Sequence, residues 1–193
     1  MEWDGWMATR QAKYPNENFV RFVAKNYYDV PDRSKVRFLD LGCGAGANTW
    51  YLAHEGFRVT AVDRSESALA SLRHRFQEER FPHQVVFLER DINHLDVAPA
   101  CFDCVLDHNT LCHIEKPPFD AIHDALKDGG RFFSVAPALD TWRGTLEGKG
   151  FCRVASEHEV REMLKMFSDV KIRHSSYPAG DHDITSWIIE ATK

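Results

Sequence analysis

The sequence predicts an α/β layer fold in a single domain. Apolar residues change between a helical and a strand-like spacing about every ten to fifteen residues, which is typical of helices packed against a sheet. No internal repeat, low-complexity tract or linker divides the 193 residues. With 44% hydrophobic residues, the chain has enough apolar material for one core.

Composition argues against two classes of partner. The formal net charge is −5, from 24 Lys+Arg against 29 Asp+Glu, so the protein repels nucleic-acid backbones and anionic membranes. Its apolar runs are far shorter than the roughly 20 residues of a membrane-spanning helix. The N-terminal residues show no signal-peptide pattern, and the five cysteines show no disulfide-framework spacing. We therefore expect a cytoplasmic protein with reduced thiols, and neither a nucleic-acid nor a membrane partner.

The first predicted helix follows Pro15. Asn16 is suited to cap its N-terminus, because its side-chain oxygen can accept from a free backbone N–H of the first turn. The apolar residues at helical spacing are Phe19, Phe22, Val23 and Tyr27. This pattern predicts an amphipathic leading helix.

A strand, a glycine loop and a helix come next. Residues 36–41 form a short apolar run, and the helix after the loop is predicted to end at Gly56. The glycines of the loop are Gly42, Gly44 and Gly46. A second strand over residues 58–62 is predicted to end at Asp63.

The remainder of the chain continues the alternation. Ser65 can cap a helix with apolar residues on one face, Pro117–Pro118 can begin another that Gly129–Gly130 ends, and Ser156 forms a capping box for the last. The apolar face of the helix after Ser65 consists of Ala68, Leu69, Leu72 and Phe76. Further strands are predicted over residues 85–88, 102–106, 131–136, 170–173 and 184–189. The first two are expected to be buried, and a loop with Pro178 and Gly180 is expected to join the last two.

The glycine loop predicts a binding site for a nucleotide-like ligand. Glycines let a ligand approach bare backbone, and the helix N-terminus attracts an anion, although glycines also serve in tight turns. Asp63 can accept both ribose hydroxyls of a nucleoside, or it can cap the helix near Ser65. A dinucleotide fingerprint is disfavoured because the third glycine, Gly46, comes one residue early and Asp40 precedes the loop.

These residues resemble those of a known family, the class I S-adenosylmethionine-dependent methyltransferases. The resemblance covers about half of the chain, in family order and spacing. It rests on FLDLGCGAG at 38–46, VTAVDRS at 59–65, RDI at 90–92, FDCVLD at 102–107 and LKDGGRFF at 126–133.

The resemblance implies a Rossmann-like, doubly wound, seven-stranded and mostly parallel sheet with an antiparallel last strand, in a three-layer α/β/α arrangement. It implies one methyltransferase domain over residues 1–193. Within it, residues 1–35 would form a leading helical segment and lid, and residues 36–137 the cofactor-binding core. Residues 138–193 would supply acceptor-side loops, a helix and the closing strand pair.

The resemblance also implies the cofactor contacts. The three loop glycines would cradle the methionyl moiety of S-adenosylmethionine, and Asp40 would orient its amino group. Asp63 would hold the ribose hydroxyls, with Arg64 next to it. Asp91 would accept from the adenine amine, with the backbone of Ile92 beside it. Near the methionyl end, the resemblance places Asp107, His108 and Asn109.

The acceptor side carries no diagnostic motif. His108 and His113 are the candidate bases for a hydroxyl acceptor, with a structural or cofactor-lining role as the alternative. Arg10 would suit the methionyl carboxylate. The candidate substrate-binding residues are Trp6, Tyr14, Trp142 and Arg143, whose rings would otherwise pack under loops.

We therefore predict an S-adenosylmethionine-dependent methyltransferase that acts on a small-molecule acceptor and releases S-adenosylhomocysteine. The alternatives are an NAD-type oxidoreductase on a similar sheet and a non-catalytic cofactor-binding partner protein. A monomer and a homodimer fit the sequence equally. No metal site is predicted, because strand alternation would separate Cys101 from Cys104, the first pair of a set completed by Cys112 and His113.

Overall fold

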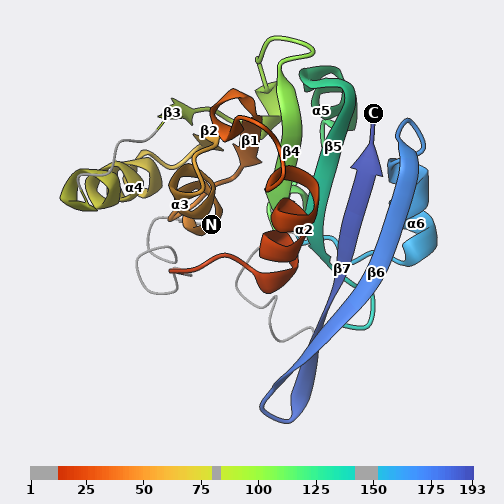
Figure 1. The fold of residues 1–193 in the computed structure, drawn as a ribbon. Coiled ribbons are helices and arrows are strands. Elements are labelled where there is room, and N and C mark those ends of the chain that lie inside the picture. Colours follow the sequence, from red (N-terminus) through yellow and green to blue (C-terminus); the bar gives the residue numbers. More distant parts are fainter. Residues whose placement is uncertain (1–12, 80–83, 142–151) are drawn as a thin grey trace. The chain divides into compact units, whose positions relative to one another are not determined.

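The computed structural model describes residues 13–79, 84–141 and 152–193. The chain forms two compact units, residues 2–95 and residues 96–193. Seven strands form a mixed sheet with the order β3-β2-β1-β4-β5-β7-β6 (Figure 1). The predicted α/β fold with a seven-stranded, mostly parallel sheet that ends in antiparallel pairing is confirmed.

The first unit alternates helices and parallel strands. Its helices and strands are α2 (Glu17–Tyr27), η1 (Arg33–Lys35), β1 (Arg37–Leu41), α3 (Ala47–His54), β2 (Arg58–Asp63), α4 (Glu66–Glu79), β3 (Gln84–Glu89) and η2 (Ile92–His94). β1 and β3 both pair with β2 in parallel, with Phe38 opposite Val59. Parallel neighbours require a crossover connection, and α3 and α4 supply the two crossovers.

Local signals account for the starts of two helices in this unit. The Asn16 side chain accepts from the backbone N–H of Asn18 at 2.9 Å, so Asn16 caps α2 as predicted. Ser65 Oγ accepts from the backbone N–H of Ala68 at 3.2 Å at the start of α4. The predicted apolar face of α4 is buried, and Leu72 and Phe76 lie in a cluster with Ala53 and Ala61.

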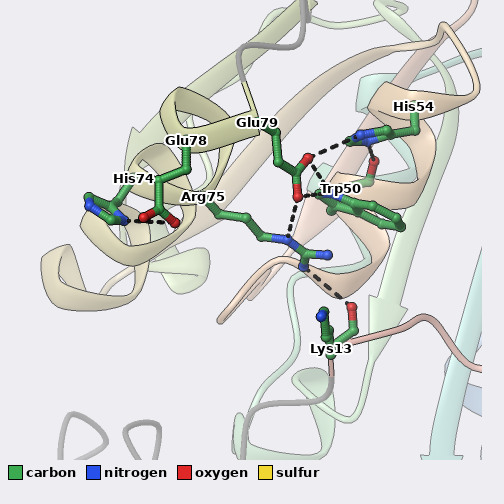
Figure 2. Close-up of polar contacts among 7 residues, drawn as sticks. All are labelled: Lys13, Trp50, His54, His74, Arg75, Glu78 and Glu79. Atoms are coloured by element: carbon green, nitrogen blue, oxygen red, sulfur yellow. Dashed lines mark hydrogen bonds and ion pairs between the residues drawn. The ribbon is translucent and has the colours of Figure 1, made fainter.

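A polar network joins α3 to α4 at their surface (Figure 2). The Trp50 indole N–H donates to both carboxylate oxygens of Glu79, at 2.9 and 2.8 Å, and His54 Nε2 lies 3.1 Å from Glu79 Oε2. The Arg75 guanidinium lies 4.3 Å from the centroid of the Trp50 ring. Burial tends to raise the pKa of Glu79, but the Trp50 hydrogen bond and the charges of His54 and Arg75 outweigh it and lower that pKa.

One prediction about this unit is wrong. β3 was expected to be buried, but Val86 is 55% exposed. β3 is the first strand in the sheet order, and only Val85 and Phe87, which lie on the other face, pack against the cluster of α3 and α4. An apolar run therefore did not indicate burial on both faces.

The second unit contains the antiparallel part of the sheet. Its helices and strands are β4 (Phe102–His108), η3 (Leu111–His113), α5 (Phe119–Ala125), β5 (Leu126–Pro137), α6 (Glu157–Met163), β6 (Ser168–Ala179) and β7 (His182–Thr192). β4 and β5 are parallel, whereas β7 is antiparallel to both β5 and β6. The predicted capping box is present, since Ser156 accepts from the Glu159 N–H and Glu159 accepts from the Ser156 N–H.

Two predicted boundaries in this unit are wrong. Gly129–Gly130 do not end a helix: α5 ends at Ala125, and the glycines lie within β5, where Lys193 N donates to Gly130 O at 2.9 Å. The closing strands are longer than predicted and form a continuous hairpin (Figure 1). Pro178 lies in β6 opposite Asp183, and Gly180, at φ 69°, forms the tight turn.

Candidate functional site

Three left-handed glycines shape the loop between β1 and α3. The φ angles are 63° at Gly42, 52° at Gly44 and 76° at Gly46, all in a region that other residues rarely adopt. Gly46 also N-caps α3, and its own backbone N–H donates to Cys43 O at 2.8 Å. A Cβ at Gly46 would lie 2.3 Å from Leu72 Cδ1. The loop therefore requires glycine for its backbone conformation and, at Gly46, for close packing against Leu72, and it leads directly into a helix.

Asp63, at the end of β2, is tied to this loop. Its Oδ2 accepts from the backbone N–H of Gly44 at 2.8 Å, and its Oδ1 accepts from the N–H of Ser65 at 2.9 Å. The second contact belongs to the turn that begins α4, as the capping interpretation expects. A carboxylate has about four lone-pair sites, so two remain for hydroxyl donors. The structure thus combines the turn-forming role with a fixed, half-buried acceptor.

Asp40 lies behind the loop, within the core. It is 1% exposed, and its Oδ2 accepts from the hydroxyl of buried Thr49 at 2.6 Å, which joins β1 to α3. Cys43, between the first two glycines, packs partly against the apolar cluster below. Burial, together with the negative charges of Asp40 and Asp63, raises the pKa of the Cys43 thiol. Cys43 is therefore a neutral packing residue of the loop.

Asn48 was not singled out by sequence reasoning. It lies in the first turn of α3, two residues after Gly46, and it is 7% exposed. Its side-chain oxygen is buried and has no hydrogen-bond partner among the described residues. A buried acceptor without a donor is costly, so this oxygen is suited to a ligand's N–H or ammonium group. Its position just after the loop was the available signal.

Asp91 and Ile92 follow β3. Asp91 is exposed and caps η2 by accepting from the backbone N–H of Asn93 at 2.9 Å, while Ile92 is buried. Arg64 is exposed in the turn between β2 and α4. An exposed carboxylate beside a buried apolar residue can accept from an amine while the apolar side chain covers a ring face.

In the second unit, Asp107 is a fully buried anchor. Its Oδ1 accepts from the backbone N–H groups of Thr110 and Leu111, both at 2.9 Å, and its Oδ2 accepts from the Ser134 hydroxyl at 2.6 Å. Burial raises the pKa of Asp107, while these three hydrogen bonds act in the opposite direction. The carboxylate therefore fixes the turn that follows β4.

The neighbouring polar residues are arranged by that turn. Asn109 is exposed with φ 56°, and its N–H donates to Val135 O at 2.8 Å. Burial lowers the pKa of His108, which keeps its imidazole neutral near pH 7. His113, at the end of η3, lies beside two cysteines, Cys112 and Cys152. The surroundings of His108, one of the two predicted bases, favour its proton-accepting form.

A pocket in the second unit adjoins Asp107. Residues of β4, η3, α5, β5, α6 and β7 line it, and it is partly open to solvent. Its walls are mainly apolar, with polar groups from Asp107, Ser134 and Arg153. This combination of an apolar lining and a few polar anchors is typical of small-molecule sites.

The predicted acceptor residues, and Arg10, which was predicted to bind the methionyl carboxylate, are only partly described. Trp6, Arg10, Trp142 and Arg143 lie outside the described residues. Tyr14 is 63% exposed in the first unit and makes an edge contact with Trp50, with ring centroids 6.3 Å apart. Its ring is thus available at the surface next to α3.

Comparison with known proteins gives a consistent family. A family model described as a methyltransferase domain matches residues 38–130. The chain is 27% identical over 156 residues to the uncharacterized methyltransferase YodH of Bacillus subtilis (strain 168), covering 77% of this chain and 65% of that protein. It is 33% identical over 135 residues to the ubiquinone biosynthesis O-methyltransferase of Xylella fastidiosa (strain 9a5c), covering 68% of this chain and 52% of that protein. The chain thus spans less than two thirds of the length of these curated relatives.

A solved structure agrees with the sequence relatives. The 1,6-didemethyltoxoflavin-N1-methyltransferase of Burkholderia thailandensis, with bound 1,6-didemethyltoxoflavin and S-adenosylhomocysteine, is 26% identical to this chain. The TM-score is 0.62, with 81% of this chain and 70% of that chain covered. Among helices within the described ranges, none is long and apolar enough to cross a membrane. The glycine loop, the Asp63 acceptor, the sheet order and these similarities together show that the chain belongs to the class I S-adenosylmethionine-dependent methyltransferases.

Proposed function

We propose that this protein transfers a methyl group from S-adenosylmethionine to a small-molecule acceptor. The observation that carries the proposal is the carboxylate of Asp63, which Gly44 and Ser65 hold at the end of β2 with lone pairs to spare. A fixed acceptor beside a glycine loop suits a nucleoside with an attached charged chain. In this proposal, residues 1–193 act as one catalytic domain in the cytoplasm.

The residues of the first unit fit the cofactor chemically. Asp63 would accept from the ribose hydroxyls, and the backbone of the glycine loop would lie against the methionyl chain. The unpartnered oxygen of Asn48 supplies an acceptor for the methionyl ammonium group. Asp91 would accept from the adenine amine beside buried Ile92. Asp40, through Thr49, would hold α3 in place under the loop.

The rest of the chemistry is positioning. When bound, the cofactor supplies an electrophilic methyl group on a positively charged sulfur. The protein's part is to hold the acceptor atom in line with that methyl group and to exclude water. For a hydroxyl acceptor, His108 would take the proton at a ring nitrogen, since burial keeps its imidazole unprotonated at neutral pH.

The pocket beside Asp107 supports a small acceptor. Its lining is mainly apolar with a few polar groups, which is typical of sites for small molecules. The relative from Xylella fastidiosa is named for ubiquinone biosynthesis, and the structure from Burkholderia thailandensis holds 1,6-didemethyltoxoflavin. Both names favour a small-molecule acceptor for this chain.

Isothermal titration calorimetry of the full chain tests the cofactor assignment. We expect S-adenosylmethionine and S-adenosylhomocysteine to bind and NAD to give no heat. Asp63→Ala should weaken both interactions by about ten- to a hundredfold, because hydrogen bonds to a charged group contribute about 1.5–3 kcal/mol. Asp32→Ala is the matched control: Asp32 accepts from the Ser34 N–H at 3.0 Å in a similar turn but belongs to no proposed contact.

The outcomes separate the alternatives. Loss of affinity in the Asp63 variant alone supports the site, whereas an equal loss in the Asp32 variant would show a general effect on folding. Binding of NAD but of neither sulfur compound would favour an oxidoreductase. Acceptor screening for S-adenosylhomocysteine formation then tests turnover, and cofactor binding without turnover on any acceptor would favour a non-catalytic partner protein.

A further inference from the structure

Two cysteines and a histidine come together in the second unit. The sulfurs of Cys112 and Cys152 and a ring nitrogen of His113 all lie within 4.8 Å of one another. Cys112 and His113 belong to η3, and Cys152 belongs to the segment before α6. The residues that resemble a metal-binding set in the sequence combine Cys112 and His113 with Cys101 and Cys104. Neither Cys101 nor Cys104 is in this cluster.

Backbone and side-chain contacts hold the two segments together independently of the cysteine sulfurs. The Arg153 N–H donates to Cys112 O at 2.7 Å, and the Arg153 guanidinium donates to Glu115 O at 2.6 Å. Farther along the second segment, the Trp187 indole N–H donates to Ala155 O at 2.7 Å. These contacts of its neighbours thus hold Cys152 beside η3.

The geometry suits a tetrahedral metal ion. With zinc–sulfur bonds of about 2.3 Å, two sulfurs of a tetrahedral site lie about 3.8 Å apart, and sulfur and nitrogen lie about 3.5 Å apart. Ligand atoms that already lie within 4.8 Å need to approach by no more than about 1.3 Å. Two sulfurs and one imidazole nitrogen also form a donor set that selects zinc over calcium or magnesium.

We propose that Cys112, His113 and Cys152 bind a zinc ion through two thiolate sulfurs and one ring nitrogen. Two thiol protons pass to solvent when the ion binds. Three protein ligands leave one coordination position for water or for a donor atom of an acceptor molecule. Cys112 and Arg153 line the pocket beside Asp107, so the ion lies at the wall of that pocket. His113 is then a ligand rather than a base.

Cobalt substitution tests the site without reference to methyl transfer. The full chain, kept reduced with a phosphine, is titrated with Co²⁺ and then with Zn²⁺. We expect one Co²⁺ per chain, a sulfur-to-cobalt charge-transfer band in the near ultraviolet, tetrahedral bands in the visible range, and displacement by Zn²⁺. Cys152→Ser should weaken metal binding by a factor on the order of 10–100 or more, since altering even an outer-shell partner has that effect.

Matched variants and a fold readout keep the test decisive. Cys101→Ser, a half-buried cysteine outside the cluster, should leave the spectrum unchanged. His113→Ala should shift the visible bands but keep the charge-transfer band, because both sulfurs remain. Far-ultraviolet circular dichroism and S-adenosylmethionine affinity, measured without metal, show whether each variant is folded and keep this site distinct from the cofactor site.

Three results would overturn the zinc site. They are a reduced wild-type chain with no charge-transfer band, a Cys152→Ser variant that binds Co²⁺ as tightly as the wild type, and equal losses in the Cys101→Ser and Cys152→Ser variants. A disulfide between Cys112 and Cys152 in air, found by mass spectrometry together with no metal binding in the reduced chain, would identify the pair as a redox couple instead.

Discussion

Replacing Gly46 by alanine should be among the more destabilising single-methyl changes in this protein. At φ 76°, an alanine adopts the left-handed region at a cost of about 1–2 kcal/mol. Its Cβ would also lie 2.3, 2.4 and 2.8 Å from Cδ1, Cδ2 and Cγ of Leu72. Leu72 is fully buried in an apolar cluster and cannot move away freely, so overpacking adds about 1–3 kcal/mol. We therefore expect Gly46→Ala to lower the free energy of unfolding by about 2–5 kcal/mol.

Gly180→Ala provides the control for backbone strain. Gly180 has nearly the same φ, 69°, but no atom lies within 4 Å of an added Cβ. We expect a loss of only about 1–2 kcal/mol there. Urea denaturation of both variants, followed by circular dichroism at neutral pH, gives the free energies of unfolding. The difference between the two variants measures the overlap with Leu72.

A double-mutant cycle with Leu72→Ala tests the cause directly. Leu72→Ala removes all three atoms that the new methyl would meet, at a cost of about 2–5 kcal/mol on its own. The double variant should then be less destabilised than the sum of the single variants by about 1–3 kcal/mol. Additive effects, or equal losses in Gly46→Ala and Gly180→Ala, would refute the steric reasoning.

Three further predictions concern side-chain networks. Glu79→Gln should destabilise the protein at neutral pH and make its stability less dependent on pH in acid. The lowered pKa of the Glu79 carboxyl contributes stability that is present above the ordinary value of 4.5 and is lost as pH falls through the folded-state pKa. Urea denaturation across acid pH checks this. Asp107→Asn keeps one oxygen for two backbone donors and gains an amide that can donate to the serine hydroxyl. Because the pKa of Asp107 is raised above 3.8, the stability of the wild type relative to this variant should fall as pH rises through the folded-state pKa, which unfolding titrations between about pH 4 and 8 would detect. Ser156→Ala should lower the free energy of unfolding by about 1 kcal/mol through loss of the N-cap of α6, also measured in urea.

Two of these changes have a matched control variant, and the third is tested by its own pH dependence. Glu78, the neighbour of Glu79 in the sequence, forms an exposed pair with His74, and Glu78→Gln should leave the loss of stability in acid unchanged (Figure 2). An Asp107→Asn variant with the same pH dependence as the wild type would show that burial does not perturb this carboxyl. Ser176→Ala, on the exposed part of β6, should have almost no effect, and an equal loss there would contradict the capping argument.

The elements that the sequence predicted correctly are those whose signals are local. The apolar face of α4 and the Ser156 capping box depend on residues within one or two helical turns of each other, so their periodicity and caps are visible in the chain. The end of β2 and the glycine loop after β1 were also predicted correctly, because β1 and β2 are short apolar runs bounded by loop residues. Where pairing with a distant strand decides the boundary, as at Gly129–Gly130, the prediction failed.

The candidate site divides in the same way. The residue types of the glycine loop and of Asp63 identified a nucleoside-binding family from the sequence alone. Only the tertiary structure showed that Asp63 is held by Gly44, 19 residues earlier, that the oxygen of Asn48 is buried without a partner, and that Cys152 lies beside Cys112. Helix caps and apolar periodicity depend on residues that are close in the sequence, so the sequence alone shows them. Burial and ligand geometry depend on the path of the whole chain, which brings distant residues together.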